Sequence, residues 1–278
     1  MSLLDKLSAV PDPWNRAFLV LIVSASVAAT AILCVNDGAD FSVSAGLVLA
    51  ASVLAAWPFG RSRLRNSESS GVIPAPTGPQ RSLPFLGGAW VLLVPALVMA
   101  DTTYLGWTVT LAPLALLTVW RLLLSENRAA KLILAPLAMG FPFMVTAVAM
   151  GRPQCGGFPA ALAILVSAVA FSTRDLEARV LAASCEQDPA SHPSYHRTLA
   201  VVSTILFFFG VVALWPWLGK LYGDRYLWVL VVGLLAPLLF FWGRLRQPRG
   251  EHPLNALIRF NRLVPYIGIV LLLAIVVG

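Results

Sequence analysis

The segment CGGFPAALAILVSAVAFSTRDLEARVLAASCEQD, residues Cys155–Asp188, contains the pattern that decides the fold. Its first half, Cys155–Ser172, has no charged residue and as a helix would cross most of the roughly 30 Å hydrocarbon core of a bilayer. The chain then becomes polar at once, with Thr173-Arg174-Asp175. This change predicts a transmembrane helix that leaves the membrane near residue 173.

The same apolar character recurs along the whole chain. Eight further segments lack Asp, Glu, Lys, Arg and His: Ala17–Val35, Phe41–Phe59, Leu83–Ala100, Tyr104–Trp120, Leu132–Met150, Leu199–Leu218, Tyr226–Trp242 and Leu263–Gly278. Only 12% of the 278 residues are charged, whereas a soluble domain carries roughly 25%. Lipid must therefore solvate most of the surface. We predict an all-α polytopic membrane protein, a bundle of nine transmembrane helices that forms a single domain over residues 1–278.

The positions of the basic residues predict the orientation. Of the 20 Lys and Arg residues, all except Arg152, Lys220 and Arg225 fall in one set of alternate loops. Because cytoplasmic loops of membrane proteins carry an excess of Lys and Arg, the N-terminus is expected inside and the C-terminus outside. The inner loops are then 60–82, 121–131, 173–198 and 243–262. We expect a multi-pass protein of a bacterial cytoplasmic membrane, with membrane lipids as its surroundings.

The net charge of +7 does not indicate a nucleic-acid partner, because the basic residues lie between apolar segments rather than in one block or stripe. On the expected outer face, Asn36-Asp37-Gly38-Ala39-Asp40 consists of ordinary turn formers and predicts a turn. Cys34 and Cys155 both fall near that face. A disulfide between them and two unpaired thiols are both compatible with this placement.

The inner loop that begins at residue 173 carries candidate metal ligands. Asp175 and Glu186 lie eleven positions apart, close to three helical turns, with Glu177 and Asp188 beside them. Carboxylates so placed can hold Mg²⁺ together with substrate phosphate oxygens. We therefore expect Asp175 and Glu177 as catalytic residues and as Mg²⁺ ligands, with Glu186 and Asp188 as further ligands. The alternative is a solvated helix with an ordinary ion pair between Asp175 and Arg179.

Basic residues on the same expected face are candidate phosphate ligands. They are Arg121, Arg128, Lys131, Arg174 and Arg179. Arg and Lys near a cytoplasmic cavity can bind a diphosphate, although the same residues also serve as anchors at lipid headgroups. Asn255, Arg259 and Arg262 recur at helical spacing before the last apolar segment, which predicts an amphipathic turn at the membrane interface.

This layout resembles the UbiA superfamily of intramembrane prenyltransferases. Those proteins have nine helices, an inside N-terminus and a cytosolic active-site cap, with an NDxxDxxxD motif after helix two and a DxxxD-like motif after helix six. Arg174-Asp175-Leu176-Glu177 is similar to the second motif, although Arg179 stands where that motif has its second aspartate. The first motif has no counterpart, because the basic segment 60–68 contains no aspartate.

Short segments also resemble the YwiC-like membrane proteins, a family that looks related to UbiA. They are the basic stretch after the second apolar segment, Glu126-Asn127-Arg128-Ala129-Ala130, Pro193-Ser194-Tyr195-His196 and Arg259-Phe260-Asn261.

The resemblance implies a divergent prenyltransferase scaffold. An active protein would transfer a prenyl group from a polyprenyl diphosphate to a small hydrophobic acceptor in the membrane. The alternative is a non-catalytic membrane protein, an assembly factor, scaffold or transporter, on a degenerate prenyltransferase fold. A coupled transporter is disfavoured because the apolar segments contain no ionisable residue.

Overall fold

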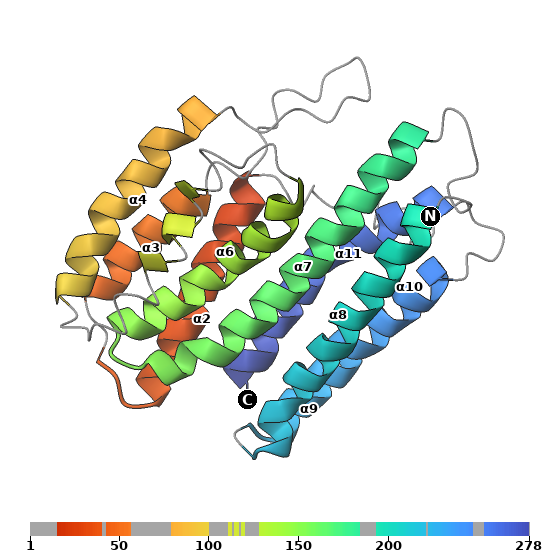
Figure 1. The fold of residues 1–278 in the computed structure, drawn as a ribbon. Helices are drawn as coiled ribbons and strands as arrows, with labels where there is room; N and C mark the ends of the chain where they lie inside the picture. The colour runs from red at the N-terminus through yellow and green to blue at the C-terminus, as the bar shows by residue number, and fades with distance from the viewer. Residues whose placement is uncertain are drawn as a thin grey trace. The chain divides into compact units, whose positions relative to one another are not determined.

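The computed structural model describes residues 16–40, 43–56, 79–99, 111–119 without 113 and 117, 128–183, 193–220, 222–246 and 253–277. Within these residues the chain forms helices joined by short turns and contains no strand (Figure 1). The prediction of an all-α protein is confirmed. Contacts divide the chain into two compact units, Met1–Ala160 and Ala161–Gly278. The prediction of a single domain over residues 1–278 stays a prediction.

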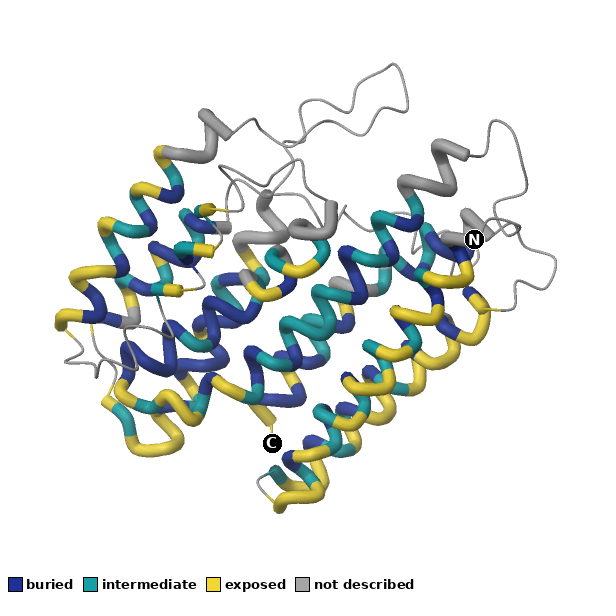
Figure 2. The backbone as a smooth tube through the Cα atoms, viewed as in Figure 1, coloured by how far each residue is buried: buried dark blue, intermediate teal, exposed yellow. Residues whose placement is uncertain are grey.

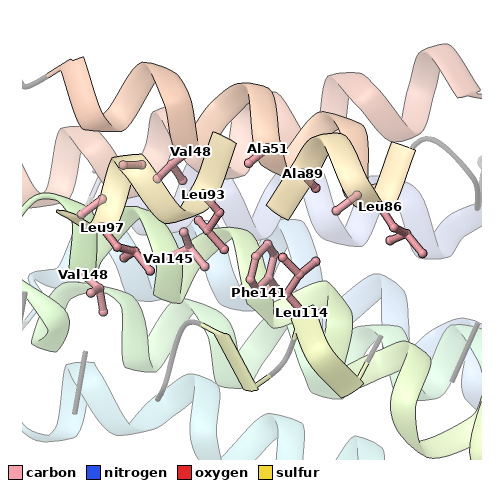
Figure 3. Packing of buried hydrophobic residues seen from close by; sticks show 13 residues of the cluster. Val48, Ala51, Leu86, Ala89, Leu93, Leu97, Leu114, Phe141, Val145 and Val148 are labelled. Atoms are coloured by element: carbon pink, nitrogen blue, oxygen red, sulfur yellow. The ribbon is translucent and has the colours of Figure 1, made fainter. Parts of the chain in front are cut away.

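The first unit contains α2 (Arg16–Asn36), α3 (Val43–Ala56), α4 (Pro79–Met99), α6 (Arg128–Ala149) and the beginning of α7 (Pro153–Ala183). The most extensive packing is between α3 and α4. Small buried side chains at this contact, among them Ala51 and Ala89, let the helix backbones approach closely. Leu93, Phe141 and Val145 fill the adjoining core, as Figure 3 shows.

Two glycine caps end α2 and α6. Gly38 has φ +83° and Gly151 has φ +69°, a left-handed conformation that glycine adopts without steric cost. At the first cap, the amide of Gly38 donates to Val35 O (2.9 Å) and that of Ala39 donates to Cys34 O (2.9 Å). The second cap repeats this pattern through Gly151 and Arg152, and both satisfy carbonyls that a helix end leaves unpaired. The turn predicted at residues 36–40 is confirmed.

The second unit contains the rest of α7, α8 (Pro193–Leu218), α9 (Asp224–Leu230), the π-helical turn η4 (Val231–Leu235), α10 (Ala236–Arg246) and α11 (Pro253–Val277). The wide turn η4 comes just before Pro237, which cannot donate a backbone hydrogen bond and so favours a local departure from α-helical geometry. Within this unit α11 contacts α9, η4 and α10. The hydroxyl of the buried Tyr226 donates to Ala213 O and joins α9 to α8.

Among the residues that the structure describes, four helices are long and apolar enough to cross a membrane: Pro153–Glu177, Tyr195–Leu218, Asp224–Arg246 and Ala256–Val277. Shorter apolar helices occupy Leu21–Asn36, Gly46–Ala55, Pro84–Met99 and Met139–Ala149. Many residues along α8 to α10 are exposed (Figure 2). The large apolar side chains among them include Phe207, Phe208, Trp215, Trp228, Leu239 and Phe240. An apolar surface of this kind requires lipid rather than water around it. The chain is an integral membrane protein; the nine spans and the orientation of the termini stay predictions.

Helices extend into segments that the apolar pattern assigns to inner loops. The 31 residues of α7 are about 46 Å long, more than the hydrocarbon core requires. Residues 173–183 therefore continue the helix with good helix formers such as Leu, Glu, Ala and Arg. Likewise, α8 begins at Pro193 and α11 at Pro253, before the apolar segments themselves. Helical structure therefore positions the candidate polar residues.

Candidate functional site

The candidate site lies in the second unit, where α7 changes from apolar to charged. Thr173 is 0% exposed, and the next residues, Arg174, Asp175 and Glu177, are half-buried. Leu176 is buried among them and keeps this turn of the helix attached to the core. The charged residues thus stand beside packed apolar side chains instead of extending freely into solvent.

Helix geometry separates the two candidate catalytic carboxylates. Residues two positions apart on an α-helix do not face each other, so Asp175 and Glu177 lie on different faces of α7. Thr173 and Glu177, four positions apart, share one face. That face is the one that meets α11, because both Thr173 and Glu177 contact Asn261.

Asn261 joins the two helices through its side-chain amide. Its Nδ2 donates to Glu177 Oε2 at 2.5 Å, and the Thr173 hydroxyl donates to Asn261 Oδ1 at 2.5 Å. The amide nitrogen of Asn261 donates and its oxygen accepts, so the nitrogen faces Glu177 and the oxygen faces Thr173. The Thr173 oxygen also lies 2.8 Å from Val169 O, the usual helical alternative for its proton. We call Thr173, Glu177 and Asn261 the Glu177 network.

Charged and aromatic residues are neighbours of the Glu177 network along the two helices. Arg174 and Arg259 are both half-buried, and they and Asp175 take part in interactions within the structure. Phe260, next to Asn261, is buried and packs edge-on against Trp242 with ring centroids 5.9 Å apart. This packing holds the α11 backbone in place. The result is an oriented carboxylate between two helix segments that each carry a guanidinium group.

No protein-family model and no curated protein matches the chain. Among solved structures, one described as digeranylgeranylglyceryl phosphate synthase in membranes is similar, with a TM-score of 0.63. The similarity covers 94% of this chain and 95% of that one. The chain has the fold of a UbiA-superfamily membrane prenyltransferase. Because the sequence identity is 15%, the similarity shows a shared fold and nothing more.

On this UbiA fold, the other candidate residues have the following positions. Arg179 belongs to α7, while Arg128 and Lys131 form the first turn of α6; the side chains of all three are outside the described residues. Arg121, Glu186 and Asp188 are themselves outside the described residues. Their predicted roles in diphosphate and Mg²⁺ binding therefore stay predictions.

Thr173 and Asn261 are site residues that the sequence reasoning did not select. Asn261 belongs to the Arg259-Phe260-Asn261 segment noted for its resemblance to YwiC-like proteins, and Thr173 is the first residue after an apolar segment. A polar residue at either position is compatible with an ordinary interfacial helix. Thr173 and Asn261 could have been selected only as two polar residues at helix ends that both contact the carboxylate of Glu177. That contact can be predicted only when it is known that α7 and α11 are neighbours.

Proposed function

We propose that this protein is a divergent intramembrane prenyltransferase that binds a polyprenyl diphosphate beside the Glu177 network. It transfers the prenyl group to a small hydrophobic acceptor within the membrane. The observation that carries this proposal is the oriented, half-buried Glu177, bound by Asn261 at the polar end of an apolar helix. The fold of a membrane prenyltransferase supports it. We place the protein in a bacterial cytoplasmic membrane, with the network on the inner side.

The proposed chemistry requires few groups. The bond between the first prenyl carbon and the diphosphate oxygen breaks, a bond to the acceptor forms, the acceptor loses a proton, and diphosphate leaves. Negative charge grows on the leaving diphosphate, so fixed positive groups near it lower the barrier. Arg174 and Arg259 supply guanidinium groups on the two helices that the network joins. The apolar surfaces of the helices hold the isoprenoid chain.

Mg²⁺ fits this arrangement only as a metal held largely by the substrate. Among the described residues, no group of three or more His, Cys, Asp and Glu is placed to hold a metal ion. Mg²⁺ is commonly bound through one or two carboxylates plus substrate phosphates. We propose Glu177 as one such ligand. Asp175, on another face of α7, and Glu186 and Asp188 are the further candidates. When bound, the ion would neutralise part of the diphosphate charge.

Binding of a labelled prenyl diphosphate tests the proposal. Full-length protein in lipid nanodiscs is titrated with farnesyl and geranylgeranyl diphosphate, with Mg²⁺ and then with a chelator. We expect Mg²⁺-dependent binding that weakens at least tenfold in Glu177→Gln. Asp224→Asn is the matched control, because Asp224 accepts a hydrogen bond from Trp217 at the turn between α8 and α9, away from the network. Wild-type protein that binds neither diphosphate, or equal losses in both variants, would contradict the proposal.

A non-catalytic scaffold on the same fold is the second candidate. The observation that favours it is the basic segment 60–68, where an active UbiA-like protein would carry its first acidic motif. Replacing Asp175 and Glu177 together by Ala in cells separates the two functions. An unchanged phenotype at normal protein abundance supports the scaffold, and loss of the phenotype at normal abundance supports catalysis.

A further inference from the structure

Two cysteines meet in the first unit. Cys34 lies two residues before the end of α2, and Cys155 lies in the first turn of α7. Both thiols are free, and they lie within hydrogen-bonding reach of each other. Ala31, Ala147 and Met150 complete the small apolar cluster around them. The two residues are far apart in sequence, so the fold alone brings them together.

Backbone and side-chain contacts hold this pair in place. The two glycine caps that end α2 and α6 lie next to the cysteine pair. Asp37 and Arg152 follow those helix ends, and their side chains extend toward each other. Asp37 Oδ2 accepts hydrogen bonds from Gln154 Nε2 (3.0 Å) and from Cys155 Sγ (3.7 Å). Arg152 Nη2 donates to Gly38 O (3.3 Å). We call Cys34, Asp37, Arg152, Gln154 and Cys155 the thiol cluster.

Close packing next to the pair sets the position of the first turns of α7. A Cβ atom at Gly156 would lie 2.7 Å from Ala147 Cβ and 2.7 Å from Phe143 O, so the start of α7 contacts α6 directly at this glycine. Cys155 is the neighbour of Gly156 and shares that fixed backbone. A disulfide requires Cα atoms within about 7 Å and correctly directed Cβ atoms. The two thiols are already in contact, and the backbone beside each of them is held in place. They can therefore reach disulfide geometry with little movement.

We propose that Cys34 and Cys155 form a dithiol that closes to a disulfide by exchange with a disulfide-bonded oxidant. In the first step one thiolate attacks a sulfur of the oxidant RSSR and releases one RS⁻. The second cysteine then attacks the mixed disulfide and releases the other RS⁻. The two protons lost by the cysteines end on the two leaving groups as RSH. The cysteines are oxidised, and the oxidant is reduced to two thiols.

Exposure sets the order of the two steps. Cys34 is 0% exposed, whereas Cys155 is partly exposed, so an oxidant reaches Cys155 first. Cys34 lies directly behind it and resolves the mixed disulfide. Charge distribution predicts that this end of the helices is on the outer face, the side on which disulfides form and persist. The bridge would tie the end of α2 to the start of α7.

Thiol counting with oxidised glutathione tests the bridge. The third cysteine, Cys185, lies outside the described residues, so the experiment uses Cys185→Ser as the background. Membranes with this variant are treated with oxidised glutathione, denatured, and labelled with a maleimide–polyethylene glycol that shifts the band on a gel. We expect no shift and no added glutathione mass after oxidation, and a double shift after reduction. A double shift that persists after oxidation would overturn the proposal.

The order of attack is tested by trapping the mixed disulfide. In the same background, Cys34→Ser should accumulate a glutathione adduct at Cys155, detected by mass spectrometry as a mass increase that a reductant removes. Cys155→Ser should form far less adduct at the buried Cys34. Cys34→Ala repeats the trap if serine at the buried position prevents folding, with the melting temperature in detergent as the check. Equal adducts on both single-cysteine proteins, or an adduct on Cys34 alone, would contradict the assignment.

Discussion

The thiol cluster and the Glu177 network both join helices that are remote in sequence, but they do so by different means. The thiol cluster depends on two glycine caps and on contacts of exposed side chains, Arg152 at 39% and Asp37 at 48% exposure. The Glu177 network depends on hydrogen bonds between half-buried or buried side chains. An exposed polar contact competes with water, whereas a buried one leaves unsatisfied groups when it is broken. A hydrogen bond should therefore contribute more to the free energy of unfolding in the Glu177 network than in the thiol cluster.

The largest effect is expected at the close contact next to the thiol cluster. Gly156→Ala should lower the free energy of unfolding toward the upper end of about 1–3 kcal/mol, because the new methyl group meets Phe143 O and Ala147 Cβ. Thermal unfolding in detergent measures this. Gly157→Ala is the matched control, since nothing lies within 4 Å of a Cβ there and helical Ala is more favourable than Gly by roughly 0.5–1 kcal/mol. Equal effects would show that the contact is not tight.

The two side-chain amides give the sharpest comparison between the clusters. Asn261→Leu should cost about 1–3 kcal/mol, because Glu177 and the buried Thr173 lose their shared partner. Gln154→Leu removes the amide that donates to the exposed Asp37 and should change stability by less than about 0.5 kcal/mol. Paired thermal unfolding curves measure both. A larger loss for Gln154→Leu would reverse the proposed difference between the two clusters.

The glycine cap at the end of α2 should show an intermediate effect. Gly38→Ala should cost about 1–2 kcal/mol, because its φ of +83° is unfavourable for a residue with a Cβ atom. The thiol pair should also close to a disulfide more slowly, since the amide of Ala39 in this cap donates to Cys34 O and holds the backbone at Cys34 in place. Gly46→Ala in α3 is the control, as its surroundings are open and its φ is helical. Unchanged stability in Gly38→Ala would mean that the cap is dispensable.

The ion pair of the thiol cluster should give the smallest effect. Arg152 Nη1 and Asp37 Oδ2 are 3.8 Å apart with both side chains well exposed, so a double-mutant cycle with Asp37→Asn and Arg152→Gln should give a coupling below about 0.5 kcal/mol. The coupling should fall further at high salt. A coupling above about 1 kcal/mol would indicate that this pair is shielded from solvent more than its exposure suggests.

Local chemistry made much of the fold predictable. The apolar segments predicted helices, and the described residues of those segments are helical apart from Met150, which lies in the turn after α6. Asn36-Asp37-Gly38 predicted a turn because glycine and asparagine accept backbone conformations that other residues avoid. The site was only partly predictable. Glu177 was selected for its charge at a helix boundary, but nothing in its neighbours along the chain identifies Asn261 as its partner.

By itself, the sequence determined that this protein is helical and embedded in lipid, because an uninterrupted apolar segment is a property of neighbouring residues and the low content of charged residues is an average over the surface. Only the tertiary structure decided that Glu177 meets Asn261 and that Cys34 meets Cys155. Such pairs arise from which helix faces pack together, and shape complementarity between remote segments sets that choice.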